Sequence, residues 1–208
     1  MMKEELMNIF NELYEDYGQQ NWWPGEGLEI AIGAVLTQQT NWNNVERALQ
    51  KLREEDCLNL DCLQKINLER LEELVRPSGY YRVKAKRLKN LVELLKINPF
   101  PDRETLLSVK GLGNETVDSI LLYLFKKLFF VIDAYTFRIF NRIGLYSGKK
   151  YLELQQIFMD NLPNDLQLYQ EYHALLVKHA KVCCTKNNPQ CETCVIKDNC
   201  LFNLERNK

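Results

Sequence analysis

The stretch Pro101–Arg138 reads PDRETLLSVKGLGNETVDSILLYLFKKLFFVIDAYTFR and organises the rest of the chain. It predicts a short helix capped by Asp102, a hairpin at Gly111-Leu112-Gly113, and a second helix capped by Asn114. Glycines let the backbone approach a partner closely, and a helix N-terminus offers unpaired N–H groups, so the hairpin predicts a phosphate-binding site. An apolar run then leads to Asp133, which we expect at the edge of a dry core. The same pattern also fits an ordinary helix–turn–helix corner in which Asp133 is only an N-cap.

The remainder of the chain also predicts helices. Val, Ile and Thr do not alternate with polar residues at period two, and the prolines fall at boundaries. Residues 28–37, LEIAIGAVLT, are nearly all apolar and predict a central core helix. We therefore expect an all-α fold with two lobes and a cleft between them. Residues 22–132 would form a six-helix domain with a helix–hairpin–helix at 102–127, and residues 1–21 plus 133–208 would form the second lobe.

Composition is that of an ordinary soluble protein, with 46% hydrophobic and 26% charged residues among 208. A chain of this length buries roughly 70% of its unfolded surface, in one large or two small domains. Because the net charge is −1, nucleic-acid binding would have to rest on local basic patches. The opening MMKEELMNIFNELYEDYG predicts an acidic amphipathic helix rather than a signal peptide, and no apolar run reaches membrane-spanning length. We therefore expect a cytoplasmic protein with no membrane partner.

The seven cysteines are unevenly placed along the chain. Cys57 and Cys62 come early and are predicted to be buried or half-buried thiols. The other five fall within residues 183–200. In a chain without an export signal, such crowding predicts metal binding rather than disulfides.

Four of these five cysteines follow the pattern Cys184-x6-Cys191-x2-Cys194-x5-Cys200. Four thiolates can hold either tetrahedral zinc or a [4Fe–4S] cluster. Zinc modules usually pair their ligands in two short knuckles, and only one gap here is that short. The spacing therefore favours the iron–sulfur cluster, with zinc as the alternative and Cys183 as the spare thiol.

This cysteine pattern resembles the iron–sulfur loop of the endonuclease III and adenine-mismatch glycosylase group. Residues 109–116 (VKGLGNET) resemble that family's helix–hairpin–helix, and residues 131–138 (VIDAYTFR) resemble the segment with its essential aspartate. Residues 36–40 (LTQQT) are similar to the segment whose glutamine enters the duplex. The resemblance covers roughly residues 25–200 and identifies the chain as a base-excision DNA glycosylase of the helix–hairpin–helix superfamily. It implies a monomer that acts on double-stranded DNA with a damaged base and carries a [4Fe–4S] cluster on residues 184–200.

The resemblance assigns Asp133 the role of stabilising an oxocarbenium-like sugar and positioning or activating water. Bifunctional members carry a lysine two positions after the second hairpin glycine, and that lysine attacks the sugar. Here Gly113 is followed by Asn114 and Glu115, and a carboxylate cannot form an imine. We therefore expect monofunctional hydrolysis of the glycosidic bond. Two alternatives stay open: a bifunctional glycosylase/lyase that uses another lysine, and a non-catalytic iron–sulfur module that only binds DNA.

All three tryptophans, Trp22, Trp23 and Trp42, flank the expected cleft. They predict a stacking pocket for a flipped base, although we expect one of them to be a core anchor instead. Alkylated purines carry positive charge, which a tryptophan face attracts by about 0.5–2 kcal/mol. The arrangement resembles the 3-methyladenine glycosylase branch of the family, which implies an alkylated purine such as 3-methyladenine as substrate.

DNA contacts are expected from the glutamine segment, the hairpin and the basic helix RVKAKRLKNLVELLK, although a run of charge is often only a solvated face. The residues we expect to touch DNA are Gln38, Gln39, Gly111, Gly113, Lys84 and Arg87. Arg142 is a further basic candidate, and His173 and His179 are predicted to be structural.

Overall fold

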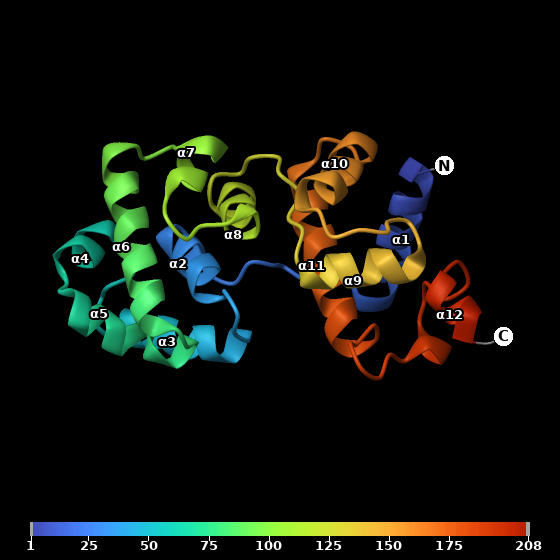
Figure 1. Ribbon diagram of the computed structural model, residues 1–208, viewed down its shortest axis with the longest axis horizontal. Helices are drawn as coiled ribbons and strands as arrows, with labels where there is room; N and C mark the ends of the chain where they lie inside the picture. The colour runs from blue at the N-terminus through green and yellow to red at the C-terminus, as the bar shows by residue number, and fades with distance from the viewer. Residues whose placement is uncertain (1, 207–208) are drawn as a thin grey trace. The chain divides into compact units, whose positions relative to one another are not determined.

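The computed structural model describes residues 2–206, and this part of the chain is helical throughout its regular elements, with no β-strand (Figure 1). The prediction of an all-α fold is confirmed. The described residues form two compact units. We call Trp23–Lys126 the central unit, and the segments up to Trp22 and from Lys127 onward together the terminal unit.

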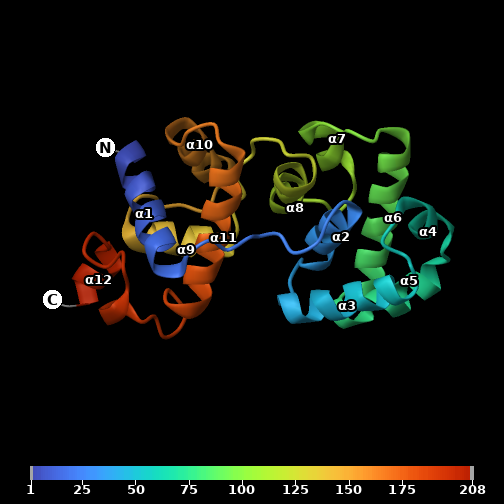
Figure 2. The same ribbon diagram turned by 180° about the vertical axis from the view of Figure 1, so that it is seen from behind.

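The central unit is built around one apolar helix. In α2 (Leu28–Leu36), every residue from Ile30 to Leu36 is buried, which confirms the predicted core helix. Helices α3, α6 and α8 pack around it (Figures 1 and 2). Besides α2, the helical elements of this unit are α3 (Trp42–Glu54), α4 (Leu60–Lys65), α5 (Leu68–Val75), a 3-10 turn (Arg76–Ser78), α6 (Tyr81–Ile97), α7 (Arg103–Ser108), α8 (Asn114–Ser119) and a π-helical turn (Ile120–Leu124).

Short polar side chains cap helices α3, α4, α5 and α7 of the central unit. Asn41 caps α3 and Asp102 caps α7, each accepting a hydrogen bond from the backbone N–H three residues on. The predicted cap at Asn114 is wrong, because α8 begins there and Gly113 precedes it in an extended conformation. The Asn114 side chain instead accepts a hydrogen bond of 2.9 Å from Arg103 Nη2.

An ion pair joins the two helices of the hairpin motif. Arg103 on α7 donates from Nε to Asp118 Oδ1 at 2.7 Å and from Nη2 to Asp118 Oδ2 at 3.0 Å. The Asp118 side chain is fully buried. A bidentate pair of this kind fixes both distance and angle between α7 and α8, so it holds the hairpin in shape.

Asp118→Ala should therefore lower the free energy of unfolding by about 3–5 kcal/mol, because the Arg103 charge would lose its buried partner. Urea unfolding followed by circular dichroism measures the change. Glu73→Ala is the matched control, since it breaks an ion pair with Arg70 whose side chains are 48% and 62% exposed, and it should leave the midpoint unchanged. Equal midpoints for the two variants would contradict a structural role for the buried pair.

The terminal unit joins the first helix to the last third of the chain. Helix α11 is buried along most of its length and packs against α9 and α1 (Figure 2). Phe130 stacks on Phe158 with ring centroids 3.9 Å apart, and Tyr172 donates a hydrogen bond of 2.8 Å to Leu6 O. The helical elements of this unit are α1 (Met2–Tyr17), α9 (Ala134–Ile143), α10 (Tyr151–Asn161), α11 (Leu166–Val182), a 3-10 turn (Cys191–Thr193) and α12 (Leu201–Arg206).

Cys57 and Cys62 form a disulfide, so the prediction that both are free thiols is wrong. Their Cα atoms lie 5.1 Å apart, within the range that a disulfide spans. The turn between α3 and α4 brings the two residues together, an arrangement that the cysteine count alone does not reveal.

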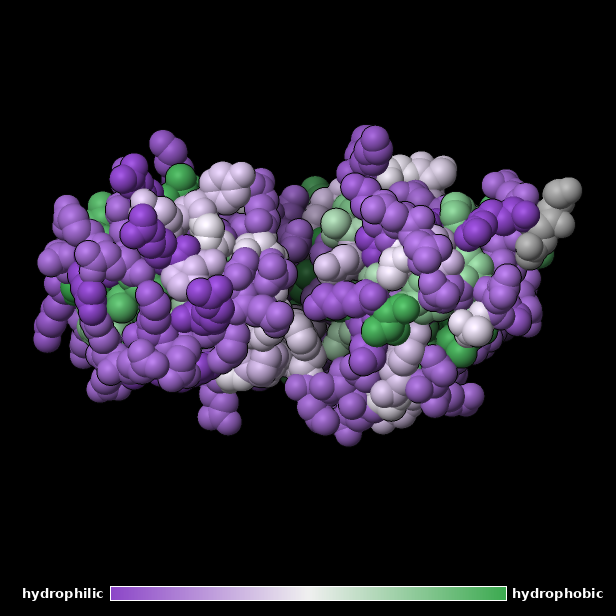
Figure 3. All heavy atoms as spheres, turned by 90° about the horizontal axis from the view of Figure 1, so that it is seen from below, coloured by the Kyte–Doolittle hydropathy of each residue, from purple (hydrophilic) through white to green (hydrophobic). Residues whose placement is uncertain are grey.

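Figure 3 shows the side chains on one face of the molecule by their hydropathy. The face seen in Figure 3 is largely hydrophilic, and apolar residues appear on it only in small groups. Within residues 2–206, none of the helices combines the length and apolar character that a membrane span requires.

Candidate active site, hairpin and cysteine loop

Asp133 lies directly before α9 and is the N-cap of that helix. Its Oδ1 accepts hydrogen bonds from Thr136 N at 2.7 Å and from Thr136 Oγ1 at 2.9 Å. Its other oxygen, Oδ2, lies 3.7 Å from His173 Nε2 on α11. Only 12% of the Asp133 side chain is exposed. A carboxylate with one oxygen fixed by its own helix and the other turned toward a histidine is therefore held in one orientation.

The ionisation of Asp133 reflects opposing influences. Burial disfavours the charged form and by itself would raise the pKa of this carboxyl. The contact with His173 and the hydrogen bonds from Thr136 act in the other direction and outweigh burial, so the pKa of Asp133 lies below its ordinary value. Asp133 is therefore an anion at neutral pH in a place where little water screens it.

The hairpin is tied to the end of α2 through Gln38. The Gln38 amide donates hydrogen bonds to Gly111 O at 3.2 Å and to Thr116 Oγ1 at 2.9 Å, and Arg87 donates to Gln38 Oε1. Gly111 has φ +96°, and a Cβ there would lie 2.3 Å from Arg87 Nε. Only glycine fits this position, because the Arg87 side chain crosses the hairpin in close contact with its backbone.

The structure brings Gln38, Arg87 and the hairpin together. The two glutamines differ in how exposed they are. Gln38 is half-buried in the bonds just described, whereas Gln39 is exposed and has φ +55°. Gly111 and Gly113 are both exposed. The backbone amides of the hairpin thus remain our predicted phosphate contacts, together with the two glutamines and Arg87.

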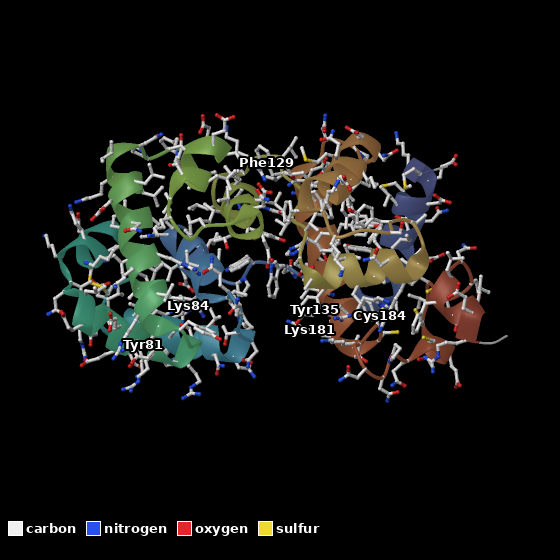
Figure 4. All side chains as sticks on the ribbon, in the orientation of Figure 1. Tyr81, Lys84, Phe129, Tyr135, Lys181 and Cys184 are labelled. Atoms are coloured by element: carbon white, nitrogen blue, oxygen red, sulfur yellow. A yellow bond between two sulfur atoms is a disulfide. The ribbon has the colours of Figure 1, made fainter. Side chains whose placement is uncertain are left out.

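Lys84 was expected to contact phosphate, and that prediction is wrong. Its side chain is 1% exposed, and Nζ donates hydrogen bonds to Leu36 O at 2.8 Å and to Ser78 O at 2.6 Å (Figure 4). Burial, together with nearby Arg87, lowers the pKa of Lys84 to about 8. The sequence pattern could have predicted this burial, because Lys84 precedes Leu88 by one helical turn and so lies on the same, buried face of α6.

The structure brings two of the three tryptophans together. Trp23 and Trp42 lie in the central unit with ring centroids 5.2 Å apart in an edge-to-face arrangement. Trp23 also lies 5.4 Å from the ring of Tyr123, and a Cβ at Gly33 would meet its ring at 3.1 Å. Trp23 thus makes the contacts of a core anchor, and Tyr123 is a neighbour that the sequence did not indicate.

Trp22 belongs to the terminal unit. Its ring centroid lies 5.9 Å from Lys181 Nζ. This contact is a cation–π pair between the end of α11 and the segment after α1.

Two arginines on α9 hold the cysteine-rich segment. Arg142 Nη1 lies 3.2 Å from Cys184 Sγ and donates a hydrogen bond of 2.7 Å to Thr185 O. Arg138 donates to Cys184 O at 2.9 Å and to Ala180 O at 2.8 Å. Arg142, a basic candidate for DNA contact in the sequence, is thus bound to this loop instead. The helix that begins at Asp133 is therefore fastened at its other end to the cysteines.

The four cysteines of the spacing pattern line one cavity, part of which is open to solvent. Cys184 lies in it just beyond the end of α11 (Figure 4). Apolar side chains such as Ile139, Ile143 and Ile196 form its walls. Four soft sulfur donors around an apolar space fit an iron–sulfur cluster. The other three cysteines of the spacing pattern that line it are Cys191, Cys194 and Cys200.

His179 and Cys183 line the same cavity. His179 Nε2 lies 3.8 Å from Cys194 Sγ, and Tyr17 is hydrogen-bonded to His179 Nδ1 at 2.8 Å. The ligand atoms of His179, Cys183 and Cys194 all lie within 4.8 Å of one another. Burial, together with Cys183, raises the pKa of Cys194 to about 12. A thiol binds a metal as the thiolate, so metal binding at Cys194 would release this proton.

Comparison with known proteins gives matches over most of the chain. The HhH-GPD superfamily model, described as a base excision DNA repair protein, matches residues 32–164. A provisionally named DNA repair glycosylase of Methanocaldococcus jannaschii is 45% identical over 213 residues, which cover 95% of this chain and 96% of that protein. An endonuclease III of Thermotoga maritima is 32% identical over 186 residues, 87% of this chain and 85% of its own.

Solved structures match as well. The H. pylori 3-methyladenine DNA glycosylase bound to 1,N6-ethenoadenine is 30% identical, with a TM-score of 0.77 over 86% of this chain and 97% of that one. A non-covalent endonuclease III–DNA complex has a TM-score of 0.87 at 22% identity, over 98% of this chain and 97% of its own. The second likeness concerns the fold alone.

Proposed function

The chain belongs to the HhH-GPD superfamily of base excision DNA repair proteins and is a DNA glycosylase, and we propose that it hydrolyses the glycosidic bond of a damaged base with Asp133 as its catalytic carboxylate. The observation that carries this proposal is the largely buried, ionised carboxylate at the head of α9. It lies within the residues that the superfamily model matches.

The chemistry follows from where charge develops. As the bond between base and sugar breaks, the base leaves with the bonding electrons and the sugar gains positive charge. A fixed anion in a poorly solvated position stabilises that charge more than it stabilises the uncharged sugar of the intact substrate. Water then supplies the hydroxyl group that completes the hydrolysis. Thr136 keeps one carboxylate oxygen in place during these steps.

The residue two positions after the second hairpin glycine supports hydrolysis without strand cleavage. That residue is Glu115, which is exposed in the first turn of α8. A carboxylate forms no Schiff base with a sugar aldehyde. Lys110 lies on the other side of the hairpin, before Gly111. The proposed reaction therefore ends at an intact abasic site.

We expect the product strand to stay intact until alkali is added, and borohydride to trap no covalent complex with the wild-type protein. Glu115→Lys should restore trapping, because it supplies an amine at the position where the lyase mechanism needs one. Glu104→Lys in the first turn of α7 is the matched control, since it adds the same charge near the hairpin at another exposed site. Wild-type protein that cleaves the untreated strand and becomes trapped would establish the bifunctional alternative.

For the base itself, we propose an alkylated purine such as 3-methyladenine. The pair of Trp23 and Trp42 supports this choice, as does the 30% identity to a 3-methyladenine glycosylase solved with a modified adenine. Aromatic stacking is worth about 1–3 kcal/mol per base, and a cationic purine adds about 0.5–2 kcal/mol over a tryptophan face. Damaged bases also leave the duplex at lower cost than normal ones.

Trp42→Ala should lower excision of 3-methyladenine at least about tenfold, because the stacking energy is lost, while binding to an abasic duplex changes little. Single-lesion duplexes with a methylated purine, ethenoadenine, a deaminated pyrimidine or an oxidised pyrimidine identify the preferred base. Trp42→Phe is the control, because it keeps an aromatic face. Equal loss of excision and abasic binding would mean that Trp42 supports the fold, and unchanged excision would place the pocket elsewhere.

We also propose that the cysteine cavity holds a [4Fe–4S] cluster through Cys184, Cys191, Cys194 and Cys200. A cluster bound there supplies four iron–thiolate bonds that cross-link this loop. Arg138 and Arg142 then connect the loop to α9, the helix that Asp133 begins. The proposed role of the loop is thus to hold this helix in place.

A further inference from the structure

A buried histidine faces the proposed catalytic carboxylate. His173 lies near the middle of α11, is 5% exposed, and directs Nε2 toward Asp133 Oδ2 at 3.7 Å. The two residues are 40 positions apart in the chain and meet because α11 packs against α9. From the sequence, His173 was predicted to have only a structural role.

The distance between His173 Nε2 and Asp133 Oδ2 indicates what kind of contact the two side chains make. At 3.7 Å the two atoms are in ion-pair range but beyond an ordinary hydrogen bond. Catalytic hydrogen bonds are often long before substrate binds and shorten in the complex. The Oδ1 atom of Asp133 is already bonded twice by Thr136, so Oδ2 is the oxygen whose position and charge depend on a partner from another helix.

We propose that His173 is a positioning residue that holds Asp133 Oδ2 and keeps this carboxylate ionised at the pH of the reaction. The proposal rests on the catalytic role of Asp133 stated above. Its physical basis is that a buried carboxyl prefers to be neutral unless donors or positive charge stabilise the anion. A protonated Asp133 would no longer stabilise positive charge on the sugar, so the partner at Oδ2 decides at which pH the enzyme works.

Other groups around Asp133 do not replace His173. Thr136, on the same helix, bonds only the opposite oxygen. From α10, the Tyr151 hydroxyl accepts a hydrogen bond from the neighbouring Ile132 N at 3.3 Å. The Arg138 guanidinium donates to Cys184 O in the cysteine segment and to Ala180 O in the last turn of α11. His173 is the titratable group whose contact lowers the Asp133 pKa.

The test compares His173→Leu, which removes the donor, with His173→Gln, whose amide nitrogen stands near the position of Nε2. Single-turnover base release is measured from about pH 5 to pH 9 on the preferred lesion. Wild type and His173→Gln should show no acid limb in this range, because the Asp133 pKa lies below 3.8. In His173→Leu that pKa rises, so the rate should fall about tenfold per pH unit on a limb within the range and recover toward high pH.

A His173→Leu profile without an acid limb in this range overturns the proposal, even if its rate is lower at every pH, because a purely structural loss scales the rate without introducing a limb. His173→Asn, whose amide is too short to reach Oδ2, takes the place of the leucine variant if that variant does not fold. Asp133→Asn is measured in parallel. Base release by Asp133→Asn at the wild-type rate would refute the catalytic role of Asp133 itself, whereas a strongly reduced rate beside a His173→Leu profile without an acid limb would refute only the role of His173.

Discussion

Asp133→Asn should lower the single-turnover rate of base release by about 10²–10³-fold, because it removes the negative charge that stabilises the developing sugar cation. The fold should survive. Asparagine is as good an N-cap as aspartate, and its side-chain oxygen can still accept the bonds from Thr136. The effect therefore isolates the charge from the cap. Base release is measured on a single-lesion duplex, and urea unfolding verifies that α9 is retained.

Asp165→Asn is the matched control for this experiment. Asp165 caps α11 by accepting a hydrogen bond of 2.9 Å from Leu168 N, and it is exposed. The same substitution in the same structural role should leave the rate unchanged. If Asp133→Asn keeps full activity, Asp133 is only a cap. The non-catalytic DNA-binding module then becomes the better description.

Cys191→Ser or Cys194→Ser should reduce the iron content from about four atoms per chain to less than one, because either change removes one of four ligands from the proposed cluster. The loop that Arg138 and Arg142 hold should then lose its cross-link and become sensitive to protease. Metal analysis of protein prepared without air, combined with limited proteolysis, measures both effects. Zinc at one atom per chain with no iron would establish the zinc alternative.

Cys183→Ser is the internal control for the ligand set. Its sulfur lines the same cavity but donates to Gln190 O at 3.4 Å, and we expect this variant to keep its iron. Cys184→Ser should lose it. The opposite result for these two neighbours would mean that Cys183, which lies close to Cys194 and His179, is the true ligand.

Much of the local structure was predictable because it depends on neighbours in sequence. The cap at Asp102 and the buried helix α2 follow from short-range hydrogen bonds and from periodicity. The all-α fold and the family also followed from motifs that are contiguous in the chain. The position of Asp133 was predicted in the same way, because an acidic residue directly after an apolar run is typical of a helix cap at the edge of a buried core.

Other features depended on which helices pack together. For these features the sequence predicted either nothing or the wrong contact. The positive charge of Lys84 predicted a contact with DNA. Packing of α6 against α2 instead buries its amine, which donates hydrogen bonds to two backbone carbonyls. Arg142 was likewise a basic candidate for DNA contact, but its guanidinium contacts Cys184 of the cysteine loop. These side chains satisfy backbone groups inside their units, because a buried polar atom needs a hydrogen-bond partner.

The contact between His173 and Asp133 most clearly separates what local sequence predicts from what helix packing sets. The sequence predicted Asp133 at the start of a helix and a structural role for His173. The packing of α11 against α9 turns this histidine toward the carboxylate, at 3.7 Å, and no sequence pattern indicated that contact. The reason is physical: local propensity sets where a helix begins and ends, whereas the packing of side chains from distant segments sets which face meets which.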